Sequence, residues 1–178
     1  RATRPTTVEG VEVAADTFPA YQDLRARMSD EEARVFAARM VSRSHSAMRH
    51  AWALRRLMSQ FSADDLATLQ PEAHAKWIAL IQSHARAFER ETAGLRQQLE
   101  PIFSSGSGSA GTGEISSDAE LMRAVERLVA LAATNYEVVR STFTVTRETS
   151  TVSAIKTAQF WQSLRSAEAL AVSIQRAH

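Results

Sequence analysis

Residues 29–61 read SDEEARVFAARMVSRSHSAMRHAWALRRLMSQF, and this stretch decides the fold. Ser29 and Glu32 have the spacing of a capping box, which marks the start of a helix. No glycine or proline follows until Pro71. Small and apolar residues then recur in steps of four and three, the period typical of helices that pack lengthwise: Ala33, Ala37, Met40, Ser44, Ala47, Ala51, Leu54, Met58 and Phe61. We therefore predict one long helix over residues 29–61.

The predicted helix has a second apolar flank. Val41, Met48 and Trp52 fall roughly a third of a turn from the seam, at 100° per residue. A helix that is apolar on two flanks either sits between two neighbours or offers one flank to a partner chain. These three residues are therefore a candidate interaction surface, and self-association through them is one hypothesis.

The same helix is rich in arginine. Six arginines and two histidines, but no acid, lie between Ala33 and Phe61. Acids on adjacent helices can balance this charge, or the arginines can bind an acidic partner, with Arg39 and Arg43 as the candidates. Because the arginines spread around the polar side instead of forming one stripe, we do not expect nucleic-acid binding.

Three further long helices follow from start signals and apolar periodicity. Pro71 suits a first helical turn, and Ser117 with Glu120 forms another capping box. The predicted long helices cover residues 29–61, 71–101, 117–144 and 152–176. Short accessory helices are expected over residues 17–28 and after Ser62.

The segments between the helices differ in composition. Residues 1–16 predict a flexible tail, and the glycine- and serine-rich residues 104–115 predict a mobile linker. Residues 144–153 are rich in β-branched and hydroxyl side chains, so a loop, a strand and a continuous helix all stay open there. We predict one all-α domain over residues 17–178, an antiparallel up-down-up-down four-helix bundle with coiled-coil-like packing.

Composition excludes several classes of protein. The 178-residue chain has a net charge of +1 and no cysteine, which excludes disulfides and thiolate zinc sites. No apolar run approaches the ~20 residues that span a bilayer. The chain begins with Arg1, so we expect a piece of a longer or processed protein. Removal of a signal or an anchor would place it outside the cytoplasm, but its compartment stays open.

Linear catalytic and metal-binding motifs are missing from the sequence. Neither Glu-x-x-His nor H-E-x-x-H, G-x-S-x-G or a P-loop is found. Gly106, Gly108 and Gly111 match G-x-G-x-x-G, but a predicted helix precedes them where a nucleotide site needs a strand. We therefore predict no cofactor and no metal. A non-catalytic domain is favoured, although catalytic groups need not form a linear motif.

Two polar residues stand out in predicted buried positions. His84 lies in the apolar stripe of the second helix, with Glu91 two turns further on, and Asn135 is the only asparagine of the chain. We interpret His84 as a neutral core histidine hydrogen-bonded to Ser44 or Asn135, and Asn135 as a residue that sets helix register. The alternative is a ligand- or metal-sensing site formed by His84, Asn135 and Glu91.

Three functional hypotheses result. The first is a non-catalytic interaction or scaffold domain whose partner is another protein or a second copy of the chain. The second is the ligand- or metal-sensing bundle, and the third is an acidic partner bound by the arginine-rich helix. Trp52, Trp77 and Trp161 are expected to be core anchors.

Overall fold

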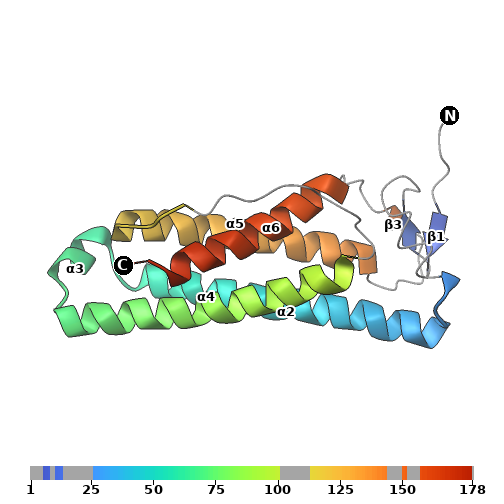
Figure 1. Ribbon diagram of the computed structural model, residues 1–178, viewed down its shortest axis with the longest axis horizontal. Helices are drawn as coiled ribbons and strands as arrows, with labels where there is room; N and C mark the ends of the chain where they lie inside the picture. Colours follow the sequence, from blue (N-terminus) through green and yellow to red (C-terminus); the bar gives the residue numbers. More distant parts are fainter. Residues whose placement is uncertain are drawn as a thin grey trace.

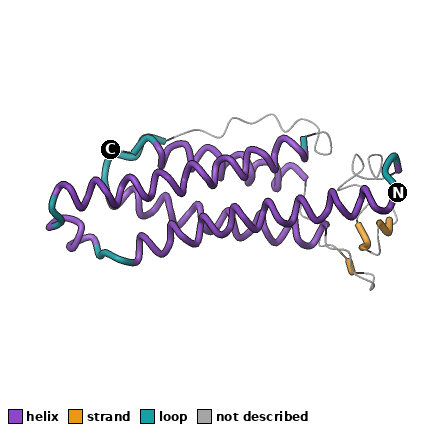
Figure 2. Tube along the Cα trace, turned by 90° about the horizontal axis from the view of Figure 1, so that it is seen from below, coloured by secondary structure: helices purple, strands orange, loops and turns teal. Residues whose placement is uncertain are grey.

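The computed structural model describes residues 6–8, 11–13, 26–100, 113–143, 150–151 and 157–177. Figures 1 and 2 show the long helices side by side as a bundle. They are α2 (Asp30–Ser59), α4 (Pro71–Leu99), α5 (Asp118–Phe143) and α6 (Thr157–Gln175), with the short α3 (Ala63–Thr68) between α2 and α4. The predicted all-α helical bundle is confirmed. The short helix predicted over residues 17–28 falls mostly outside the described residues.

Side-chain caps fix where the helices begin. Ser29 Oγ accepts a hydrogen bond from the Glu32 N–H at 3.1 Å, and Glu32 Oε2 accepts one from the Ser29 N–H at 3.2 Å. The same reciprocal pair opens α3. At the start of α5, Ser117 Oγ accepts from the Glu120 N–H, but the Glu120 carboxylate accepts from the Ser116 N–H instead of from Ser117.

Neighbouring helices all run antiparallel, but their order along the chain differs from the predicted order. α2 packs against α4 and α5, and α6 packs against the same two helices. The directions follow from contacts between residue pairs: His50–His84 and Arg43–Glu91 for α2 and α4, Phe36–Phe143 and His45–Tyr136 for α2 and α5, and Gln82–Ala177 and Arg96–Glu168 for α4 and α6. Since α4 and α5 both oppose α2, they are parallel to each other. The chain order is therefore up-down-down-up.

The predicted up-down-up-down order assumed that each helix turns back beside the one before it. The C-terminal end of α4 and the N-terminal end of α5 instead lie at opposite ends of the bundle (Figure 1). The mobile linker predicted at residues 104–115 falls mostly outside the described residues, although Ile115 is buried in the core. A connection of this length is long enough to run back along the whole bundle. The chain can therefore start α5 at the end of the bundle opposite to the one where α4 stops.

The helix order predicts a minimum length for this connection. His74 on α4 contacts Asp118 on α5 at 3.1 Å, and Glu100 lies about 39 Å further along α4 at 1.5 Å per residue. Deleting residues 104–111 leaves ten links between Glu100 and Asp118, which reach at most about 36 Å. We expect this deletion to abolish the native monomer, whereas inserting eight Gly/Ser residues leaves it intact. Thermal unfolding and size-exclusion chromatography check this; a fully stable monomeric deletion variant contradicts the helix order.

A small sheet adds to the helices. β1 (Thr6–Val8) pairs antiparallel with β2 (Val11–Val13), and β2 pairs in parallel with β3 (Ser150–Thr151). The tail predicted over residues 1–16 therefore contains two strands, and a short strand lies inside the segment 144–153. Local sequence did not indicate these strands, because β2 pairs with β3, which lies far along the chain between α5 and α6.

The core of the bundle consists of two apolar clusters with a polar layer between them. On α2 one cluster reaches Met40 and the other begins at Ala47. Ser44 lies between these two positions, and Thr92 on α4 and Asn135 on α5 occupy the matching places. All three are buried, at 3–4% exposure. Asn135 thus lies in the seam where the sequence predicted it.

Replacing Asn135 tests the role of this layer. Its Oδ1 atom has no hydrogen-bond partner within the described part of the chain. Leaving a buried polar atom unpaired costs about 1–3 kcal/mol. We expect Asn135→Leu to raise the free energy of unfolding by about 1 kcal/mol, and Asn135→Ala to lower it through the cavity it leaves. Urea unfolding measures both, and a destabilised leucine variant would show that Oδ1 is satisfied in solution.

Candidate functional site

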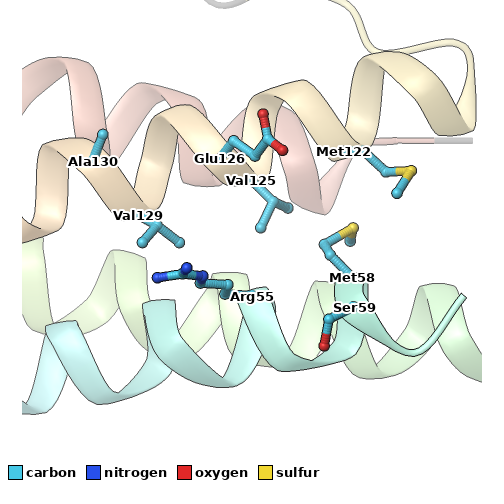
Figure 3. Close-up of a pocket in the computed structure, with 8 residues that line it drawn as sticks. All are labelled: Arg55, Met58, Ser59, Met122, Val125, Glu126, Val129 and Ala130. Carbon is cyan, nitrogen blue, oxygen red and sulfur yellow. The ribbon is translucent and has the colours of Figure 1, made fainter. Parts of the chain in front are cut away.

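A pocket of about 470 Å³ lies between α2 and α5, and Figure 3 shows its lining. Its walls are Arg55, Met58 and Ser59 from α2, with Met122, Val125, Glu126, Val129 and Ala130 from α5. Met58 and Val125 are buried, whereas Arg55 and Glu126 are exposed. The pocket therefore has an apolar floor, with a cation on one rim and an anion on the other.

A row of aromatic residues extends along the same seam. The His45 ring lies 6.2 Å from that of Trp52 and 5.7 Å from that of Tyr136 on α5. Trp52 precedes Arg55 by three residues, so both lie on one flank of α2. The row therefore leads towards the pocket. We call this surface, from His45 to Ser59 on α2 and from Met122 to Tyr136 on α5, the α2–α5 groove.

Trp52 is the large apolar residue of this row, and 46% of its surface is exposed. The expectation that all three tryptophans are core anchors is therefore wrong for Trp52, whereas Trp77 and Trp161 are buried. On the second flank predicted for α2, Met48 is buried and Val41 is partly buried. Trp52 is thus the member of that trio that is available to a partner.

Arginines surround Trp52 on the outer face of α2. Arg49, Arg55 and Arg56 are exposed and lie within one turn of Trp52. None of the three forms an ion pair with an acid among the described residues. The groove therefore carries positive charge beside its exposed aromatic residue.

The two arginines proposed from sequence lie elsewhere. Arg43 is nine residues from Trp52, which places it on the opposite side of α2 at 100° per residue. Its Nε atom is 4.0 Å from Glu91 on α4, and its guanidinium group fills the space beside Gly94. Arg39 is exposed, about 140° around α2 from Trp52. Neither residue borders the groove.

The structure does not bring the predicted sensing residues together. His84 lies half-buried at the seam of α2 and α4, with its Nδ1 atom 3.4 Å from Nδ1 of His50. Glu91 lies on the same seam, whereas Asn135 is inside the core on α5. The partner of His84 is thus a second histidine and not Ser44 or Asn135. Within the described ranges, no group of three or more histidine or acidic side chains is placed to hold a metal ion.

Sequence reasoning missed the pocket because its two walls lie more than sixty residues apart. Met58 continues the seam of its own helix and by itself gives no sign of a pocket. The detectable signal was Trp52, a large aromatic residue at a flank position among arginines. The wall contributed by α5 could be found only once the structure showed that α5 packs against α2.

Comparison with protein-family models, curated proteins and solved structures finds no match for this chain. No helix among the described residues is long and apolar enough to cross a membrane. Inferences about function therefore rest on the geometry of the groove and of the histidine pair.

The histidine pair predicts acid sensitivity. Burial lowers the pKa of His50 below its ordinary value of 6.5, as do the nearby His84, Arg49 and Arg90, while Glu91 opposes the shift. A lowered folded-state pKa means that the unfolded chain takes up the proton more readily. The contribution of neutral His50 to the free energy of unfolding is therefore fully present above pH 6.5. It is lost as the pH falls through the lower folded-state pKa.

We expect the urea concentration at the midpoint of unfolding to decrease as the pH is lowered from 6.5 to about 5. This window lies above the range in which carboxylates titrate, and EDTA in the buffer keeps metal ions away from the histidines. His50→Gln should remove part of this fall, and His45→Gln, an exposed control on the same helix, should keep it. Identical pH profiles for wild type and His50→Gln would contradict the assignment.

Proposed function

We propose that this domain is a non-catalytic interaction module that binds a segment of a partner protein in the α2–α5 groove. The observation that carries the proposal is Trp52, half-exposed beside an apolar pocket. Tryptophan, methionine and arginine are enriched at protein interfaces, and tryptophan and arginine dominate their binding energy. All three residue types occur in this groove.

The shape of the groove favours a helical segment as the partner. The groove runs between two roughly antiparallel helices, and an amphipathic helix can lay apolar side chains into such a seam. Met58 and Met122 face each other across the pocket (Figure 3), and their flexible side chains can adapt to an inserted apolar residue.

Charge narrows the chemistry of the partner. Arg49, Arg55 and Arg56 offer unpaired guanidinium groups around Trp52, so acidic residues flanking the apolar anchor would complement them. We therefore infer an amphipathic segment with an apolar stripe and acidic flanks. A second copy of this chain is the competing occupant, since Trp52 is equally open to it.

The test is a selection of random peptides of about 16 residues on the wild-type domain. We expect enriched sequences with apolar residues at helical spacing and acidic neighbours. Trp52 is the exposed one of the three tryptophans, so its fluorescence should shift to the blue on binding. Trp52→Ala should weaken binding ~30-fold, as truncation of an interface hot spot does.

Matched variants separate the groove from general surface effects. Leu80 on α4 is 50% exposed and lies outside the groove, so Leu80→Ala should bind like wild type. Arg55→Glu with Arg56→Glu should weaken binding and reduce its dependence on salt. Selected peptides that bind the Trp52→Ala variant with the same affinity as wild type would overturn the proposal. A wild-type dimer that Trp52→Ala dissociates would assign the groove to a second copy.

A further inference from the structure

The pair formed by His50 and His84 is a feature that docking in the groove does not use. His50 comes from α2 and His84 from α4, and both are half-buried at the seam of these helices. Their Nδ1 atoms are 3.4 Å apart, and their ring centroids are 5.7 Å apart with planes at 45°. Two imidazole nitrogens from different helices are therefore close neighbours, and both can offer a lone pair when each ring carries its proton on Nε2.

The distance between the nitrogens suits a shared metal ion better than a shared proton. Hydrogen bonds donated by nitrogen centre near 2.9–3.0 Å, so 3.4 Å is long for one. In a tetrahedral zinc site, with Zn–N of about 2.0–2.1 Å, two ligand nitrogens are about 3.4 Å apart. The two Nδ1 atoms thus already stand at the separation that two zinc-ligating nitrogens adopt.

The environment of His50 favours its neutral imidazole. Burial and the positive charges of Arg49 and Arg90 lower the pKa of His50, so its ring nitrogen is free to coordinate near neutral pH. Glu91 supplies a nearby negative charge, although Arg43 approaches it to 4.0 Å. Glu91 would partly offset the charge of a bound cation. The positive charges of Arg43, Arg49 and Arg90 would limit how tightly the cation binds.

We propose that Nδ1 of His50 and Nδ1 of His84 together bind a divalent zinc ion, which links α2 to α4. Imidazole nitrogen is a preferred ligand of zinc and of its neighbours in the transition series. Since no third histidine or acidic ligand is placed at this point among the described residues, water completes the coordination. The site differs from the sensing site predicted from sequence because His50 takes the place of Asn135.

The direct test is titration of Zn²⁺ into EDTA-treated, dialysed protein at pH 7.5, followed by calorimetry and thermal unfolding. We expect one ion per chain, micromolar affinity, and an unfolding temperature that rises with Zn²⁺ concentration because the ion binds the folded state. Lowering the pH from 7.5 to 6 should weaken binding, since protons compete for both nitrogens.

Matched variants decide which histidines carry the binding. His50→Gln and His84→Gln should each remove the bound ion and the thermal shift, while a His45→Gln/His74→Gln double variant should keep both. Circular dichroism in EDTA checks that the variants are folded. In NMR spectra of histidine side chains, Zn²⁺ should move the Nδ1 resonances of His50 and His84. Binding that survives either glutamine variant, or no binding at millimolar Zn²⁺, would overturn the site.

Discussion

The packing of α2 against two helices at once is the interaction on which the rest of the structure depends. The middle of its seam carries the small residues Ser44, Ala47 and Ala51, all buried. Small side chains let helices approach closely, so α4 and α5 can both lie against one helix. α6 then completes the bundle by packing on α4 and α5 from the opposite side. A bulky residue at Ala51, which is 0% exposed, would disturb this packing because the core leaves it no room.

The order of the helices determines which surfaces exist. In an up-down-up-down ring, α2 would have α4 and α6 as neighbours, and α5 would lie diagonally across. Met58 and Met122 would then belong to separate faces, and no pocket would form between them. The up-down-down-up order instead places α5 beside α2 and creates the α2–α5 groove. The histidine pair does not depend on this order, since the α2–α4 hairpin is common to both arrangements.

Much of the fold could be predicted because its signals are local. The Ser29–Glu32 capping box and the steps of four and three along α2 specify a helix start and a buried face, and both occur as predicted. Helix order is a non-local property, and the long connection before α5 left it open. The site was predictable only in part for the same reason. Trp52 and its arginine neighbours could be identified on one helix, whereas the opposite wall of the pocket and the partner of His84 required the packed structure.

The position of α6 has a consequence for how the chain acquires its structure. α2 and α4 form a hairpin from local contacts, and α5 can then dock on the free side of α2. α6 packs on α4 and α5 together, and it follows the other three long helices in the order of the chain. Until it arrives, one apolar cluster lacks Phe160, Trp161 and Leu164. A nascent chain in which α6 is not yet synthesised, or a chain truncated before α6, would therefore expose that cluster to solvent and to aggregation.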